Sequence, residues 1–128
     1  MPLRVELKPF ERITIGDIVL VNSGTRASFL VDGDAPILRE KDTVTAETAN
    51  TPVRRLYFCA QMMYLKSDIP KYRASYLGLV EDLRETIPEF LDPIDTVSDH
   101  VSGGSLYKGL QEIRKLMKLE EELSRIDA

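Results

Sequence analysis

The chain has 128 residues, of which 43% are hydrophobic and 30% charged, and its formal net charge is −4. This length is typical of one domain with a single modest core. No stretch approaches the roughly 20 apolar residues that a membrane helix needs, and residues 1–10 lack the apolar segment of a secretory signal. The acidic balance disfavours general nucleic-acid binding, so any RNA contact requires a local basic patch. We expect one cytoplasmic domain, residues 1–128.

Residues 1–42 are expected to form a β half of about five short strands. Leu3, Val5 and Leu7 alternate with charged residues, which is the period of a half-buried strand. Four more apolar or β-branched runs follow, separated by turn residues such as Gly, Asp and Asn: 10–15, 18–21, 27–31 and 37–39. This spacing predicts a small antiparallel barrel or sheet.

Residues 51–128 are expected to form a helical half, which makes the fold class α+β. Apolar residues recur here every three or four positions, and Thr51-Pro52 is a typical helix start. Residues 92–104, rich in Asp, Ser and Gly, are expected to be a loop. Three helices are predicted, from Thr51 to about residue 66, from near Pro70 to Pro88 or Pro93, and from near Ser105 onward.

The sequence offers no recognisable catalytic site, and we expect no enzyme, metal or cofactor. Its single cysteine, Cys59, lies in an apolar run and is expected to be a buried core thiol. The single histidine, His100, is expected on a surface loop. A nucleophile, a base and an acid within mutual reach are not recognisable in this pattern. The acidic run Glu120–Glu122 is expected to be a solvated helix face.

Two features suggest binding. Arg54-Arg55 falls in the first turn of the first predicted helix, where the helix dipole disfavours cations. The pair either binds an anionic partner or forms salt bridges with Glu47 or Asp42. The last predicted helix carries a wide apolar stripe that packs on the other helices, docks a partner, or meets a second copy in a homodimer. Its candidate partner-binding residues are Leu110, Ile113, Met117 and Leu123.

The chain as a whole resembles the FlbT family, bacterial regulators of flagellin synthesis. Four stretches carry the resemblance: MPLRVELKPFERI at 1–13, ILREKD at 37–42, TPVRRLYFCAQMMYL at 51–65, and YKGLQEIRKLMKLEEEL at 107–123. A shorter stretch, LRVELKPFERITIGDIVLV, resembles the opening of the CsrA translational regulators, with Phe10 in the place of a glycine.

The FlbT resemblance implies post-transcriptional regulation during flagellum biogenesis. It suggests a cytoplasmic repressor that binds the 5′ leader of flagellin messenger RNA and lowers its translation or promotes its degradation, with activation in some members. On this hypothesis seven basic residues are expected to contact phosphates: Arg4, Lys8, Arg12, Arg39, Lys41, Arg54 and Arg55. Bases are expected to stack on Tyr57 or Phe29. The alternative is a protein-interaction module that binds flagellin or the FlaF regulator without touching RNA.

Overall fold

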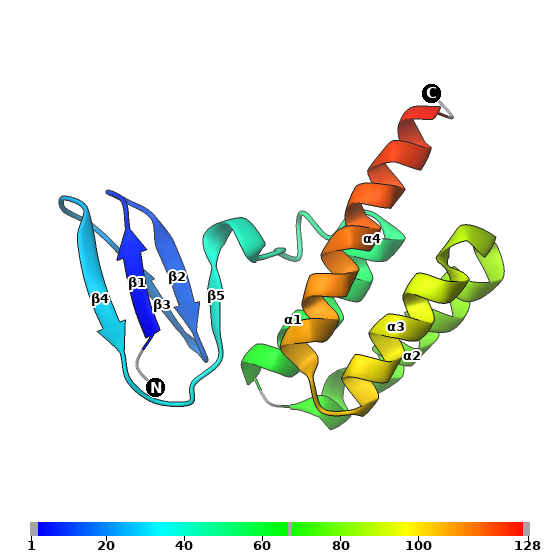
Figure 1. The fold of residues 1–128 in the computed structure, drawn as a ribbon, viewed down its shortest axis with the longest axis horizontal. Coiled ribbons are helices and arrows are strands. Elements are labelled where there is room, and N and C mark those ends of the chain that lie inside the picture. Colours follow the sequence, from blue (N-terminus) through cyan, green and yellow to red (C-terminus); the bar gives the residue numbers. More distant parts are fainter. Residues whose placement is uncertain (1–2, 67, 127–128) are drawn as a thin grey trace. The chain divides into compact units, whose positions relative to one another are not determined.

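The computed structural model describes residues 3–66 and 68–126 (Figure 1). The chain divides into two compact units, Met1–Thr43 (the β unit) and Val44–Ala128 (the helical unit). The β unit contains β1 (Leu3–Leu7), β2 (Arg12–Ile15), β3 (Ile18–Val21), β4 (Ala27–Val31), β5 (Ile37–Arg39) and the 3₁₀ turn η1 (Glu40–Asp42). The helical unit contains α1 (Pro52–Lys66), α2 (Ile69–Thr86), the 3₁₀ turn η2 (Pro88–Phe90), α3 (Leu91–Ser102) and α4 (Leu106–Ile126).

The five predicted strands and their antiparallel pairing are confirmed. Within the described residues they form two sheets instead of a closed barrel, with strand orders β1–β4 and β3–β2–β5. In the first sheet Val5 lies opposite Phe29, and in the second Ile13 lies opposite Leu20. The two sheets share a small core of Val5, Leu7 and Ile13, against which Val31 and Ile37 pack. The alternation of β1 produces this arrangement, because its apolar side chains all leave the same face.

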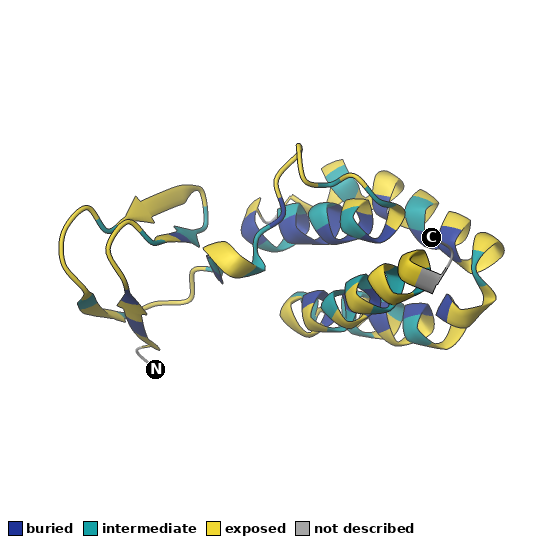
Figure 2. Cartoon of the chain, turned by 90° about the horizontal axis from the view of Figure 1, so that it is seen from above, coloured by how far each residue is buried: buried dark blue, intermediate teal, exposed yellow. Residues whose placement is uncertain are grey.

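The helical unit has four helices in its described part, and the prediction of three was wrong. The predicted starts and ends of α1, α2 and α4 agree with the structure within a few residues. Helix α1 contacts α2 and α4, and α3 contacts α4 and α2. Along these helices the buried residues, dark blue in Figure 2, alternate with exposed ones. No described helix has the length and apolarity to cross a membrane.

The missed helix, α3, occupies most of the segment expected to be a loop. Its sequence, LDPIDTVSDHVS, is rich in residues with weak helix propensity. Burial compensates for this, since Ile94 and Val97 are completely buried. Pro93 lies in the first turn of α3, where the backbone N–H groups have no partner inside the helix.

Two glycines, Gly103 and Gly104, end α3. Gly104 has a φ of +82°, a conformation that favours glycine, and Ser105 N–H donates to the His100 carbonyl at 2.8 Å. Gly109 serves a second purpose on α4, because a Cβ there would lie 3.0 Å from the Val101 side chain. Glycine therefore allows α4 to lie close to α3.

A buried side-chain amide fixes the beginning of the helical unit. Gln61 of α1 is 3% exposed. Its Oε1 accepts a hydrogen bond from Val44 N–H at 2.8 Å, and its Nε2 donates to the Val44 carbonyl at 2.8 Å. One side chain therefore satisfies both polar groups of a buried backbone position.

Replacing this amide by an apolar side chain is expected to destabilise the helical unit. Gln61→Leu leaves the N–H and C=O of Val44 buried without these partners, at a cost of about 2–4 kcal/mol in the free energy of unfolding. Urea denaturation followed by circular dichroism measures this loss. The control Gln111→Leu, at an exposed position of α4, should stay within about 0.5 kcal/mol of wild type. Equal stabilities of the two variants would contradict the role of Gln61.

Candidate nucleic-acid interface

The turn between β1 and β2 is held by one asparagine. Asn22 donates from Nδ2 to the carbonyl oxygens of Leu7 and Thr25, each at 2.9 Å, and its Oδ1 accepts a hydrogen bond from Gly24 N–H at 3.1 Å. Its Nδ2 also donates to the Lys8 carbonyl at 3.2 Å. This side chain therefore joins the end of β1 to the segment that follows β3.

The same asparagine forces a bulge that carries Phe10. The backbone N–H of Phe10 donates to the Asn22 carbonyl, while Asn22 N–H donates to the Glu11 carbonyl at 3.0 Å. Two residues of one segment thus face one residue of the other, as in a β-bulge whose first position is usually a left-handed glycine. Phe10 has a φ of 64°, which strains an aromatic residue, and its side chain is 72% exposed.

Phe10 lies between two exposed cations in the sequence. We name Lys8, Phe10 and Arg12 the turn surface. An exposed ring with flanking positive charges is the combination that single-stranded nucleic-acid sites use, with a base stacked on the ring and phosphates on the cations. The prediction of stacking on Tyr57 or Phe29 overlooked this residue. The signal was present in the sequence, as an aromatic residue between two basic ones.

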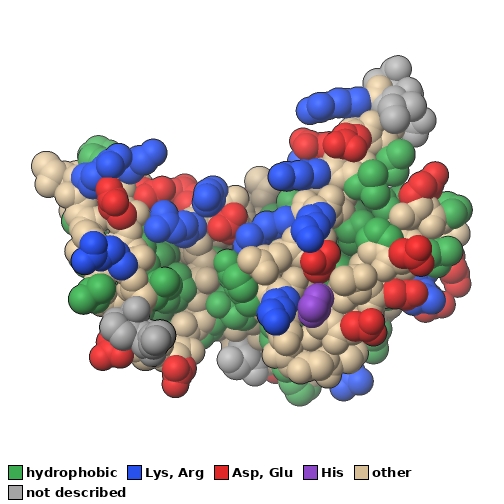
Figure 3. All heavy atoms as spheres, viewed as in Figure 1, with side chains coloured by type: hydrophobic (Ala, Val, Ile, Leu, Met, Phe, Trp, Pro, Cys, Tyr) green, Lys and Arg blue, Asp and Glu red, His purple; other side chains and the backbone are tan. Residues whose placement is uncertain are grey.

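Charge is unevenly distributed along the strands of the β unit, although its total is close to zero, with six Lys and Arg against seven Asp and Glu. The strand registers place Asp17, Asp32 and Asp34 at the strand ends away from the turn surface. Near the turn surface, two carboxylates accept backbone hydrogen bonds: Glu11 from Lys8 N–H at 3.1 Å, and Glu40 from Arg12 N–H at 3.3 Å. Figure 3 shows Lys and Arg side chains gathered on this unit with carboxylates among them.

The predicted phosphate contacts fall into separate groups. Arg4 lies on the outer face of β1, and Lys8 directly follows the end of that strand. Glu6, between them in the sequence, forms an ion pair with Arg26 at 3.0 Å. Arg39 is half-buried, and its Nη1 donates a hydrogen bond to the Glu6 carbonyl oxygen at 3.5 Å. Arg12 and Lys41 are exposed. The remaining two, Arg54 and Arg55, belong to the helical unit.

Arg54 is engaged inside the helical unit. Its Nη1 donates to Asn50 Oδ1 at 2.8 Å, and its Nη2 lies 3.9 Å from a Glu121 carboxylate oxygen. The ion pair of Arg54 is thus with Glu121, whereas the predicted salt bridges were with Glu47 or Asp42. Arg55 is exposed and lines a hollow of about 120 Å³ between α1 and α2.

Helix α4 supplies the cap of α1. Thr51 accepts a hydrogen bond at Oγ1 from Arg54 N–H at 3.1 Å, as its predicted capping role requires, and donates from Oγ1 to Glu120. The other oxygen of Glu120 accepts from Val53 N–H at 3.2 Å. This carboxylate also offsets the unfavourable position of Arg54 at the positive end of the helix dipole. The expectation of a solvated face at Glu120–Glu122 misses the role of Glu120.

Tyr57 is buried and unavailable for stacking on a base. It is 1% exposed, and its hydroxyl accepts a hydrogen bond from Arg114 Nε at 3.1 Å. The Arg114 guanidinium also lies 5.8 Å from the ring centroids of Tyr57 and Tyr107. Phe29, the other predicted stacking residue, is 46% exposed on β4.

The apolar stripe of α4 is largely consumed inside the helical unit. Leu110 and Ile113 are completely buried, so of the four predicted partner-binding residues only Met117 and Leu123, which are half-buried, are open to a partner. The stripe is wide because α4 contacts both α1 and α3.

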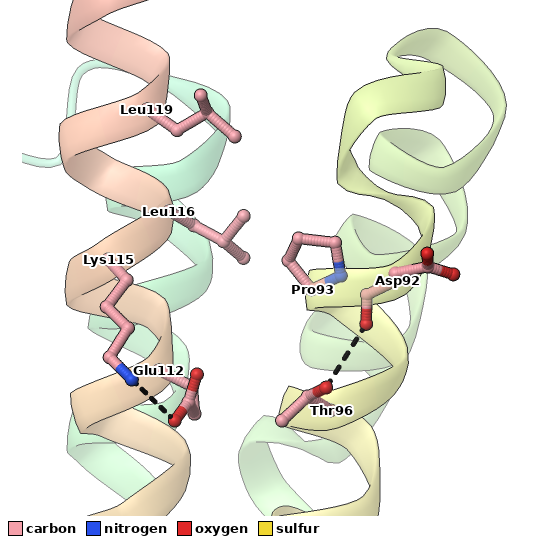
Figure 4. Close-up of a pocket in the computed structure, with 7 residues that line it drawn as sticks. All are labelled: Asp92, Pro93, Thr96, Glu112, Lys115, Leu116 and Leu119. Atoms are coloured by element: carbon pink, nitrogen blue, oxygen red, sulfur yellow. Dashed lines mark hydrogen bonds and ion pairs between the residues drawn. The ribbon is translucent and has the colours of Figure 1, made fainter.

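A hollow of about 310 Å³ lies between α3 and α4 (Figure 4). Leu116, Leu119 and Pro93 form its apolar part. Two of its charged residues pair with each other, since Lys115 Nζ lies 3.1 Å from Glu112, and Asp92 lies at its rim on α3. The hollow has the character of an apolar docking site with a polar rim.

The single cysteine and the single histidine differ in how well their predicted positions agree with the structure. Cys59 is buried, as predicted, and burial raises the pKa of its thiol, which keeps the sulfur protonated and unreactive. His100 was expected on a surface loop. It lies instead in the last turn of α3 and is half-buried.

These features define a small α+β chain with a β unit that carries an exposed aromatic and basic turn, followed by a unit of four helices in its described part. A family model described as "Flagellar protein FlbT" matches residues 3–124. The chain belongs to the FlbT family.

Relatives of the chain cover nearly all of it. A "Probable flagellum biosynthesis repressor protein FlbT" of Rhodopseudomonas palustris is 63% identical over 123 residues, which are 96% of this chain and 98% of the relative. "Probable flagellum biosynthesis repressor protein FlbT 1" of Bradyrhizobium diazoefficiens is 42% identical over 96% of this chain and 85% of the relative. The "Flagellum biosynthesis repressor protein FlbT" of Caulobacter vibrioides is 31% identical over 95% and 89%. No solved structure matches the chain.

Relief of the strain at Phe10 is expected to stabilise the β unit. Phe10→Gly removes a left-handed conformation that costs about 1–2 kcal/mol. The added chain entropy of glycine offsets about 0.5–1 kcal/mol of this, so the free energy of unfolding should rise by about 0.5–1 kcal/mol. Thermal and urea denaturation measure the change. The control Phe29→Gly, in the middle of β4, should lower the free energy of unfolding. A Phe10→Gly variant that is less stable than wild type would show that the backbone of Phe10 is not strained.

Loss of the α4 cap is expected to destabilise the helical unit. Glu120→Ala removes the acceptor of two hydrogen bonds at the start of α1 and should cost about 1–2 kcal/mol of unfolding free energy. Its matched control is Glu122→Ala, an exposed carboxylate of the same helix, with an expected change within about 0.5 kcal/mol. If both variants melt like wild type, Glu120 does not stabilise α1.

Proposed function

We propose that this protein represses flagellum biosynthesis after transcription, by binding the 5′ leader of flagellin messenger RNA in the cytoplasm and lowering its translation or stability. The repressor part of the proposal is supported by relatives that cover nearly the whole chain and bear that name. The RNA part rests on one observation, the strained and exposed Phe10 between Lys8 and Arg12.

In this proposal Phe10 stacks on a base of a single-stranded segment. Such stacking contributes about 1–3 kcal/mol per base and tolerates different sequences. Lys8 and Arg12 hold the phosphates on either side, with Arg4, Arg39 and Lys41 extending the contact over the β unit. Arg55 and Arg54 are the candidate contacts of the helical unit. Stacking on a fixed ring explains how a protein of acidic net charge achieves useful affinity for RNA.

The strain of Phe10 also supports a binding role. A backbone strained by about 1–2 kcal/mol persists when another requirement outweighs its cost. Projection of a ring into solvent gives no folding benefit, because 72% of the side chain is not covered by the protein. A ligand that covers the ring supplies that benefit in the bound state.

The second candidate function is a protein-interaction module that binds flagellin or the FlaF regulator. The observation that favours it is the apolar hollow between α3 and α4. Such a module lowers flagellin synthesis indirectly and needs no RNA contact. Substitutions at the turn surface distinguish the two functions. They should weaken RNA binding without affecting a partner bound in the hollow, because the hollow lies in the helical unit.

The proposal predicts how salt affects binding to a flagellin leader RNA. Each phosphate contact contributes about 0.7 to the slope of log K against log salt, so Lys8→Ala/Arg12→Ala should reduce that slope by about 1.4. Phe10→Ala should weaken binding about tenfold and leave the slope unchanged, since stacking releases no counterions. Fluorescence anisotropy over a series of salt concentrations measures both effects.

The control for this experiment removes two exposed cations from the helical unit. Arg73→Ala/Lys118→Ala changes the net charge by the same amount and should retain most of the affinity and slope. Arg54→Ala/Arg55→Ala tests the two candidates of the helical unit in the same assay. Identical behaviour of the turn-surface variant and the control would reject the turn surface, and a wild type without RNA affinity would favour the protein-interaction module.

A further inference from the structure

The edge strand β3 is apolar on both faces and exposed along its whole length. Ile18, Val19, Leu20 and Val21 are 61%, 52%, 45% and 49% exposed. β3 pairs with β2 on one side, and no described strand pairs with its other side. Its unpaired backbone N–H and C=O groups can therefore accept another strand.

Natural edge strands are usually protected by charges, proline or a bulge. β3 is short, but its four residues contain no charge, no proline and no bulge. The charged residues nearest to it in the sequence are Asp17, before its start, and Arg26, five residues after its end. An unprotected edge of this kind is a template for pairing with another strand.

The core of the β unit is also open at this edge. Ile18 and Leu20 leave β3 on the same face as the buried Ile13, as the strand register requires. They nevertheless remain about half exposed, and so does Phe29, which shares the inner face of the other sheet with Val5. Figure 2 shows how little of the β unit is buried. The inner layer of the β unit is therefore only partly covered.

The β unit is close to the smallest size that folds on its own. It has 43 residues, near the limit of about 40 below which disulfides, metals or oligomerisation are usually needed. The cysteine of the chain is in the other unit, and the described residues contain no cluster of metal ligands. Oligomerisation is one way in which a unit of this size gains stability.

We propose that β3 pairs antiparallel with β3 of a second copy of this chain, which joins two three-stranded sheets into one continuous sheet. A two-fold axis perpendicular to the sheet requires each residue to face itself or a residue an even number of positions away. The register centred on Leu20 places Leu20 opposite its own copy and Val19 opposite Val21. Asp17 then lies opposite Ser23, which avoids both a like charge and an apolar partner.

The alternative centre, at Val19, places Asp17 opposite Val21 and leaves a carboxylate against an apolar side chain. The Leu20 register instead places Ile18 opposite Asn22, and a neutral amide against an apolar side chain costs less than a carboxylate, so the Leu20 register is the better match. This interface does not depend on the proposed RNA contact, because β3 contains none of the candidate RNA-binding residues.

Charge substitution on β3 tests both the dimer and its register. Wild type at tens of micromolar should have the mass of a dimer by light scattering after size exclusion. Val19→Lys and Val21→Glu should each be monomeric, because each places an unpaired charge opposite an apolar residue. An equimolar mixture of the two variants should recover the dimer mass, since the introduced lysine of one chain then faces the introduced glutamate of the other.

The matched control is Leu77→Lys, which makes the same kind of change on α2 at a residue of similar exposure, 51%. It should remain dimeric. Far-UV circular dichroism establishes that the variants are folded. A monomeric wild type would overturn the proposal, and protected β3 amides in that monomer would assign the edge to another part of the same chain. Dimeric Val19→Lys, or a mixture that stays monomeric, would overturn the interface or its register.

Discussion

The hydrogen bonds of Asn22 are the constraint on which the β unit depends. Its side chain donates to carbonyl groups at the end of β1 and in the segment that follows β3, and its backbone pairs with two consecutive residues of the β1–β2 turn, Phe10 and Glu11. The resulting bulge fixes the start of β2 and therefore the register that buries Ile13. The same bulge places Phe10 in a left-handed conformation with its ring in solvent. The hydrogen bonds of Asn22 thus stabilise the β unit and also position the candidate binding surface.

The helical unit achieves its order through contacts made over long distances in the sequence. Gln61 fixes Val44 at its beginning, and Glu120 caps α1 from the far end of the chain. Helix α4 therefore contributes the carboxylate of Glu120 to α1 and an apolar surface to α3. This double use explains a helix that is apolar over more than one face in a small protein. It also leaves little of α4 for a partner beyond the rim of the hollow that it shares with α3.

Local patterns predicted the elements that depend on local physics. The alternation of β1, the turn residues between the strands and Thr51-Pro52 correctly indicated five strands and the start of α1. α3 was missed because its helical state derives from the burial of Ile94 and Val97, which no local propensity reveals. The cap by Glu120 and the burial of Tyr57 also depend on which helices meet. Phe10 was visible as an aromatic between cations, whereas its strained backbone became apparent only with the position of Asn22.

The β unit, and the turn surface within it, is on this account the place where messenger RNA binds. Titration of the isotope-labelled full chain with a flagellin leader RNA, followed by amide chemical shifts, tests this claim most directly. The account predicts that the largest shifts occur at residues 8–12 and at the neighbouring residues 22–26. Shifts confined to the helical unit, or a spectrum unchanged at saturating RNA, would contradict it.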